Sequence, residues 1–122
     1  MNKELTKKLY NDFPKLYKQN TLTPEESAMY WGFPDDGWEP LIRNISEKIE
    51  NYNNSVPEDL MVEATQVKEK FGSLRFYTNK KCTDEIEKVI SATESNSAFV
   101  CEICGSNIKK IHDNCCPKCY ES

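Results

Sequence analysis

Two pairs of cysteines near the C-terminus constrain this chain more than any other feature of its sequence. The first pair is Cys101 and Cys104, the second is Cys116 and Cys119, and 11 residues separate the two. A Cys-x-x-Cys pair can bend into a knuckle that points two thiolates at one ion, and two knuckles complete a tetrahedral site. The spacing therefore predicts that these four cysteines bind one Zn²⁺ ion.

The exact ligand set and the use of the cysteines leave alternatives open. Cys115 adjoins Cys116, and His112 lies close by, so either could replace one of the four ligands. An iron centre with the same ligands is an alternative. A redox pair is a weaker one, because neither pair lies in a βαβ pattern. Four thiolates leave zinc no open position for water, so we expect a structural ion. Cys82 is expected to be an ordinary thiol.

The rest of the chain offers little apolar material for a core. The 122 residues include 16 Lys and Arg and 20 Asp and Glu, for a net charge of -4. About a fifth of the residues are Leu, Ile, Val or Phe, which is near the limit at which chains still fold. Aromatic residues make up 11% and offset this. We therefore expect a thinly cored domain that a metal ion would stabilise.

Several classes of protein are excluded by what the sequence lacks. No apolar run is long enough to span a bilayer, and the polar, Lys-rich N-terminus does not resemble a signal peptide. We therefore expect a cytoplasmic protein that does not bind membranes. The common phosphate-binding, zinc-protease, nucleophile-elbow and dinucleotide motifs are absent. No small-molecule substrate is expected.

The pattern of apolar residues predicts an α+β fold. We expect a body over residues 1–98, with N-terminal helices, a small antiparallel hairpin and one further helix, and a four-cysteine zinc ribbon over residues 99–122. Helical spacing predicts a first helix as far as Pro14. A long amphipathic helix begins near Trp38, and another begins at Thr83.

Two helix starts are predicted from capping residues. The segment Thr23-Pro24-Glu25-Glu26 has the composition of a capping box with proline at the first helical position, so it predicts the start of a short helix. Asp36 precedes the amphipathic helix at Trp38 and is expected to cap it.

Residues 61–78 alternate as strands do. Gly72 and Ser73 fit the central positions of a type II′ turn, which places Lys70 opposite Arg75. Two opposed cations destabilise a hairpin, so we expect an anion nearby, either the acidic segment 35–39 or an external ligand. One face is predicted to hold Val67, Glu69, Phe71, Leu74 and Phe76, and the other Gln66, Lys68, Lys70, Arg75 and Tyr77.

Three segments together resemble a family of small proteins from bacteriophages and prophages whose function is unknown. They are Tyr30-Trp-Gly-Phe33 with Asp36-Gly-Trp38, Ala64-Thr-Gln-Val-Lys-Glu-Lys-Phe-Gly-Ser-Leu-Arg-Phe-Tyr77, and Cys101-Glu-Ile-Cys104-Gly105. The likeness extends from about Leu9 to Cys119. It implies a phage or prophage origin and zinc binding, and it supplies no reaction.

The chain departs from that family in two ways. The family commonly ends its metal motif with Cys-x-x-His, where this chain has Cys116 and Cys119. A long insertion that is common between the tryptophan-bearing helix and the hairpin is nearly absent here. The fourth ligand is therefore expected to be a cysteine instead of a histidine.

An enzymatic function is not expected. Glu69 interrupts the apolar face of the predicted hairpin, so it is a candidate general base with a raised pKa. An edge residue that reaches solvent or pairs with a lysine is the alternative. No second convergent catalytic group accompanies Glu69, and the predicted metal has no open position.

Two binding functions remain. In the first, the protein acts by binding a host protein, such as a defence or polymerase factor. Aromatic side chains beside acidic residues would form the contact. The anchor residues would be Trp31, Asp35, Asp36, Trp38 and Glu39, although both tryptophans could instead belong to the core. In the alternative, a zinc-ribbon protein binds nucleic acid through a basic hairpin face with an aromatic residue. That face would hold Lys68, Lys70, Arg75 and Tyr77.

Overall fold

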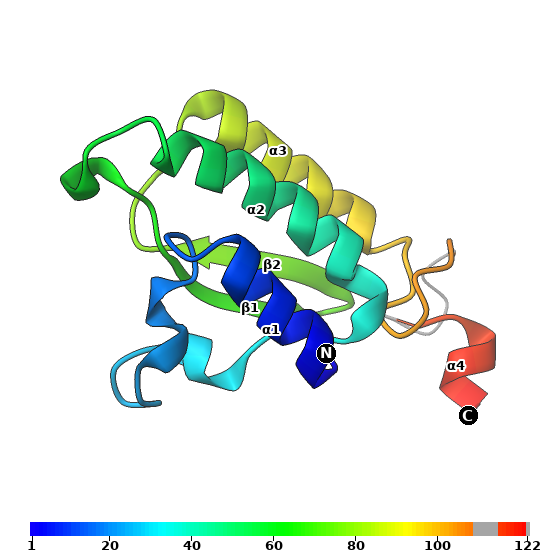
Figure 1. The fold of residues 1–122 in the computed structure, drawn as a ribbon. Coiled ribbons are helices and arrows are strands. Elements are labelled where there is room, and N and C mark those ends of the chain that lie inside the picture. Colours follow the sequence, from blue (N-terminus) through cyan, green and yellow to red (C-terminus); the bar gives the residue numbers. More distant parts are fainter. Residues whose placement is uncertain (109–114, 122) are drawn as a thin grey trace.

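The computed structural model describes residues 1–108 and 115–121 and has an α+β fold (Figure 1). Three helices and one antiparallel hairpin form the body. The helices are α1 (Lys3–Asp12), α2 (Glu39–Asn53) and α3 (Asp84–Ser97), and the strands are β1 (Ala64–Lys70) and β2 (Ser73–Thr78). A short helix, α4 (Pro117–Glu121), lies at the C-terminus. The predicted fold class is confirmed.

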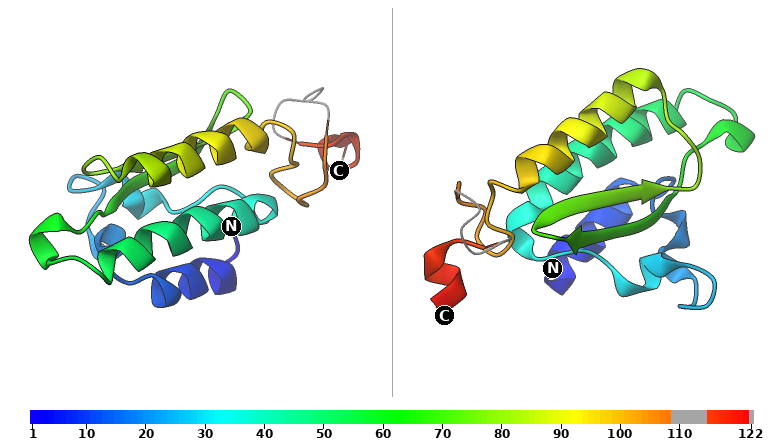
Figure 2. Two further views of the ribbon diagram at one scale, coloured as in Figure 1. Left: turned by 90° about the horizontal axis from the view of Figure 1, so that it is seen from above. Right: turned by 180° about the vertical axis from the view of Figure 1, so that it is seen from behind.

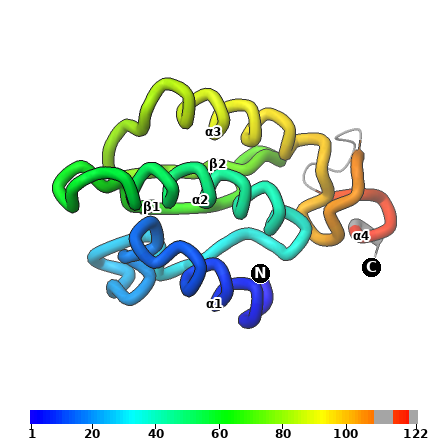
Figure 3. The backbone as a smooth tube through the Cα atoms, turned by 45° about the horizontal axis from the view of Figure 1, so that its top comes forward, coloured from blue at the N-terminus to red at the C-terminus, as the bar shows by residue number. Residues whose placement is uncertain are grey.

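The helices and the hairpin form two layers. α2 lies between α3 and α1, and α2 and α3 cover one face of the hairpin (Figures 1 and 3). Seen from behind, none of the described helices lies in front of the opposite face of the hairpin (Figure 2). The largest fully buried side chains of the body lie between residues 9 and 74 and include Leu9, Leu16, Tyr17, Met29, Trp38, Ile42, Ile45, Ile49 and Leu74.

The first two long helices follow their predicted patterns. α1 starts after Asn2, whose side chain accepts a hydrogen bond from the N–H of Leu5, and it ends before Pro14. α2 buries the predicted apolar stripe and ends at Asn53. Its start differs from the prediction, because the residue before the helix is Trp38 and no side chain caps it. Asp36 is therefore not the cap.

The predicted helix at Thr23 is wrong, and only the Glu26 half of its capping box forms, because the N–H of Glu26 donates to the backbone carbonyl of Thr23. The backbone N–H and the hydroxyl of Thr23 both donate to Glu26 Oε1, at 3.2 and 3.0 Å. These bonds hold a single turn, and the chain then continues into a 3₁₀ helix, η2 (Ala28–Trp31). Ser27 caps this second turn and Gly32, with φ 75°, ends it. A capping box stabilises a first turn, but an α-helix needs apolar periodicity beyond that turn, and this segment has none.

The hairpin turn lies one residue earlier than predicted. Phe71 and Gly72 both have positive φ, 54° and 82°, and this defines a type I′ turn with Phe71 and Gly72 at its centre. Lys70 therefore faces Ser73, and Lys68 faces Arg75. Phe71 leaves the apolar face and is 80% exposed at the turn. Phenylalanine is unusual at positive φ, so the residue type at position 71 did not indicate that this turn would form.

The role of Glu69 follows from the turn. Its carboxylate Oε2 accepts a hydrogen bond of 2.7 Å from the N–H of Gly72. Glu69 pairs with Leu74 across the hairpin and is exposed to solvent. The side chain therefore closes the turn.

Side chains of α3 accept hydrogen bonds from backbone N–H groups on the free edge of β2. The N–H of Leu74 donates to Ser97 Oγ at 2.7 Å, and the N–H of Phe76 donates to Glu94 Oε2 at 2.8 Å. An open strand edge presents unpaired N–H groups that attract other strands. The two bonds protect this edge and fix α3 along β2.

Candidate metal centre

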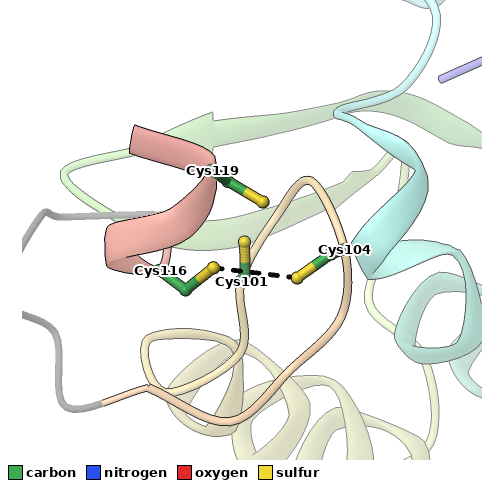
Figure 4. A group of neighbouring side chains, drawn as sticks. All are labelled: Cys101, Cys104, Cys116 and Cys119. Atoms are coloured by element: carbon green, nitrogen blue, oxygen red, sulfur yellow. Dashed lines mark hydrogen bonds between the residues drawn. The ribbon is translucent and has the colours of Figure 1, made fainter. Parts of the chain in front are cut away.

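The four predicted cysteines come together at one end of the molecule. The Sγ atoms of Cys101, Cys104, Cys116 and Cys119 all lie within 4.8 Å of one another. Their side chains point toward a common centre (Figure 4). Zn–S bonds of about 2.3 Å in a tetrahedron place the sulfurs about 3.8 Å apart, and Cys104 Sγ and Cys116 Sγ are 3.8 Å apart. The four cysteines could therefore hold a metal ion.

The first pair lies on a tight knuckle. The N–H of Cys101 donates to the carbonyl of Ser106 at 2.7 Å, and the N–H of Gly105 donates to the carbonyl of Cys101 at 2.8 Å. Gly105 has φ 81°, a conformation that glycine adopts without strain. This turn brings Cys104 back beside Cys101, as the Cys-x-x-Cys spacing predicted.

The second pair lies at the start of α4. Cys116 directly precedes the helix and Cys119 lies in its first turn, so both thiols reach the same side. Cys115 and Cys82 are not members of the group of four. Cys82 is buried, and its burial raises the pKa of its thiol to about 11. His112 lies outside the described residues.

Hydrogen bonds within the cluster shift the pKa values of its thiols. The hydroxyl and then the N–H of Ser106 lower the pKa of Cys104 to about 6. The N–H of Cys119 lowers the pKa of Cys116. A hydrogen bond between the thiol of Cys119 and Cys116 favours the protonated form of Cys119 and raises its pKa to about 12. These hydrogen bonds favour the thiolate form of Cys104 and Cys116, and thiolates are the form that binds metals.

The knuckle is fixed to the body by the segment 35–38. The N–H of Gly37 donates to the carbonyl of Glu102 at 2.6 Å, and the N–H of Asp35 donates to Glu102 Oε2 at 2.9 Å. The indole N–H of Trp38 donates to the carbonyl of Val100 at 2.8 Å. These three bonds join the residues around Cys101 to the start of α2.

Gly37 permits this close contact. A Cβ atom at position 37 would lie 2.3 Å from the carbonyl oxygen of Cys101 and 2.5 Å from that of Glu102, which no other residue could accommodate without a shift. Glu102 is itself buried. Neither residue was identified from the sequence as part of the site. The turn composition around Gly37 was visible there, but its contact lies 65 positions further along the chain.

Most of the residues predicted as a protein-binding anchor have internal roles. Trp38 is 0% exposed and belongs to the core, so the prediction that it contacts a partner is wrong. Asp36 accepts hydrogen bonds from the N–H and the side chain of Asn2, at 2.7 and 3.1 Å. Glu39 forms an ion pair with Arg43 at 3.2 Å. Asp35 is exposed and donates its N–H to Glu102. Trp31 is 72% exposed.

The predicted basic residues share one face of the hairpin. Lys68 lies opposite Arg75, and Tyr77 on the same face is 41% exposed. Within the described ranges, neither these two cations nor Lys70 forms an ion pair. The segment 35–39 therefore does not supply the expected anion. Arg75 Nε is buried and has no hydrogen-bond partner among residues 1–108 and 115–121.

Comparisons with known proteins give no relative for this chain. No protein-family model matches it, and no curated protein or solved structure matches it either. Among the helices that the structure describes, none combines the length and apolarity required to traverse a bilayer. The function must therefore be inferred from the residues themselves.

Proposed function

We propose that this chain is a small phage-type accessory protein that binds one structural Zn²⁺ ion and acts, without catalysis, by binding a host protein. The observation that carries the proposal is the exposed Trp31, on the surface of a domain whose other tryptophan is fully buried. The metal centre and the exposed aromatic residue have separate roles: one stabilises the fold, and the other contacts the partner.

The cysteine cluster supports zinc in a structural role. Four thiolates in a tetrahedral arrangement suit Zn²⁺, and such a set leaves no position for a reacting water. Three hydrogen bonds join the first knuckle to the segment 35–38. An ion at this centre would therefore stabilise both the C-terminal segment and the start of α2. Elemental analysis of the purified protein should find one zinc, and not iron, per chain.

Trp31 and its neighbour Tyr30 support protein binding. They lie at the end of η2 with their ring centroids 5.1 Å apart and their planes at 90°, and Tyr30 is 54% exposed. Large aromatic side chains that are rigid and exposed before binding are common hot spots of protein interfaces. The role of Glu69 in closing the hairpin turn supports a protein without catalysis, because that carboxylate was the candidate general base.

An affinity purification tests the proposal. The zinc-loaded protein is used to capture material from bacterial lysate, with and without nuclease, and the captured material is identified by mass spectrometry and nucleic-acid staining. We expect one stoichiometric protein that survives nuclease and is lost with Trp31→Ala. Phe71→Ala is the matched control, because Phe71 is equally exposed and lies on the hairpin turn. Capture of the same protein by Trp31→Ala would contradict the proposed anchor.

Nucleic-acid binding is the second candidate. It is favoured by the hairpin face on which Lys68, Lys70 and Arg75 have no ion pair within the described chain, beside the exposed Tyr77. Cations beside an aromatic side chain suit single strands. If this candidate holds, nuclease removes the captured material, and Lys68→Glu with Arg75→Glu abolishes binding while the protein stays folded. Unchanged binding by that double variant would exclude the hairpin face.

A further inference from the structure

A groove runs between α1 and the segment that carries η2. Its volume is about 810 Å³. One wall consists of α1 residues at helical spacing, namely Lys3, Thr6, Lys7 and Tyr10, and the other includes Tyr30 and Trp31. Residues three and four apart lie on one side of a helix, so the groove follows the length of α1. In Figure 1 the segment that contains η2 lies beside α1, toward the lower left of the view.

Packed aromatic rings make the base of this groove rigid. The ring centroids of Tyr10 and Phe33 are 5.4 Å apart, and those of Phe33 and the buried Tyr17 are 5.1 Å apart. Phe33 therefore connects the groove to the core. Gly32, with φ 75°, turns the chain between Trp31 and Phe33, so the two rings project differently: one into the core and one into solvent.

The charge of the groove has a single sign. Lys3 and Lys7 line it, and no Asp or Glu of residues 1–108 and 115–121 does. Neither lysine forms an ion pair with any residue in the described ranges. Unpaired cations beside exposed aromatic rings attract an occupant that carries carboxylates and an apolar or aromatic anchor.

We propose that this groove binds an acidic, extended segment of the partner protein, with an aromatic side chain against Trp31 and carboxylates at Lys3 and Lys7. The inference rests on the proposed function and names the chemistry of the partner. The ten residues of α1 extend about 15 Å, which matches about four or five residues of extended chain. The segment is therefore short, and it carries an acidic residue for each of the two lysines.

The charge balance favours a peptide over a nucleic acid. The chain carries a net charge of -4, so a long polyanion meets general repulsion that a short acidic segment largely avoids. Affinity for nucleic acid rises with the number of phosphates that cations neutralise, and two lysines line this groove. An apolar anchor on Trp31 supplies binding energy that does not depend on further charges.

Fluorescence anisotropy with a defined probe tests the groove. The zinc-loaded, full-length protein is titrated into a labelled short copolymer of glutamate and tyrosine, about five residues long, and separately into labelled oligo(dT). We expect the copolymer to bind, and Lys7→Glu to weaken binding about tenfold. Lys8→Glu is the matched control, because it makes the same charge change at the next position of α1, on a residue that does not line the groove. We expect it to change binding by no more than about twofold.

The aromatic part of the groove has its own control pair. We expect Trp31→Ala to weaken copolymer binding about tenfold and Phe71→Ala to leave it unchanged. Equal losses with Lys7→Glu and Lys8→Glu, or with Trp31→Ala and Phe71→Ala, would overturn the groove assignment. Tighter binding of oligo(dT) that depends on Trp31 would overturn the peptide assignment. No copolymer binding, with a host protein still captured from lysate, would reject the groove and leave the proposed function standing.

Discussion

Two tryptophans end two 3₁₀ helices only seven residues apart, and they have opposite surroundings. Trp31 ends η2 and is 72% exposed, whereas Trp38 ends η3 (Asp36–Trp38) and is fully buried. What differs is the chain that follows. Gly32 turns the chain away after Trp31, whereas Trp38 leads directly into α2, whose apolar face continues into the core. Trp38 also donates its indole N–H to Val100, next to the first metal-site cysteine.

The contrast separates a region that stabilises the fold from the region proposed to bind a partner. The segment 35–38 holds the cysteine knuckle against the body through its bonds to Val100 and Glu102. The segment 30–31 makes one wall of the α1 groove. Substitutions in the first region should therefore affect stability, and substitutions in the second should affect binding.

The largest expected difference is between the two tryptophans. Trp38→Ala should lower the free energy of unfolding by about 4 kcal/mol, because it leaves a cavity in the core and removes a buried hydrogen bond. Trp31→Ala should change it by less than about 0.5 kcal/mol, as for most exposed positions. Urea denaturation of the zinc-loaded proteins measures both. Equal losses would mean that Trp31 also supports the core.

The two glycines beside these tryptophans give the next comparison. Gly37→Ala should destabilise the protein by about 3 kcal/mol, because the added Cβ would overlap the carbonyl of Cys101 and separate the knuckle from the body. At Gly32 a Cβ would meet nothing within 4 Å, so Gly32→Ala should lose only about 1 kcal/mol through its positive φ. Thermal unfolding ranks the two variants. A larger effect at Gly32 would contradict the close contact at Gly37.

A substitution at Glu102 tests the contact between knuckle and body with a smaller expected loss of stability. Glu102→Ala should lose about 2 kcal/mol, because the N–H of Asp35 loses its acceptor. Glu85→Ala, on the exposed side of α3, is the control and should change stability by less than about 0.5 kcal/mol. Both variants keep all four cysteines. An unchanged stability with Glu102→Ala would show that this bond does not hold the knuckle in place.

The smallest expected effect lies at the metal centre itself. Ser106 lowers the pKa of Cys104 to about 6, so Ser106→Ala should raise that pKa toward its ordinary value. Protons then compete with the metal over a higher pH range, and zinc affinity near pH 7 should fall about tenfold. Above the ordinary pKa of a thiol the wild type and the variant should bind zinc alike.

Competition with a chromophoric chelator across this pH range measures the effect of Ser106. Ser91→Ala, on the exposed side of α3, is the control and should bind zinc as the wild type does at every pH. If zinc binding by Ser106→Ala has the same pH dependence as the wild type, the hydroxyl of Ser106 does not lower the pKa of Cys104.

Local patterns predicted the two long helices α1 and α2 and the cluster of four cysteines well, whereas the helix predicted at Thr23 did not form. The apolar stripe after Trp38 and the stop at Pro14 depend on neighbours within a few residues, so α1 and α2 could be located from the sequence. The two Cys-x-x-Cys pairs are equally local, and each fixes its own knuckle. That the two knuckles meet at one site is a long-range prediction. It was possible because both pairs carry cysteines that suit the same metal ion.

Features that depend on distant residues could not be predicted. The burial of Trp38 depends partly on Val100, and the need for glycine at position 37 depends on the carbonyl of Cys101. The hairpin register was wrong for a different reason. Gly72 suits either position of a two-residue turn, and the choice between them depended on Phe71 adopting a positive φ, which phenylalanine rarely does.

The central claim is that a metal at the four cysteines is coupled to the core through the segment 35–38. The most direct test is hydrogen exchange, followed by NMR, of the Gly37 N–H and the Trp38 indole N–H, with zinc bound and after removal by a strong chelator. We expect one zinc per chain, and at least tenfold faster exchange at both groups once zinc is removed. A metal-free protein as purified, or unchanged exchange at both groups after chelation, would contradict the claim.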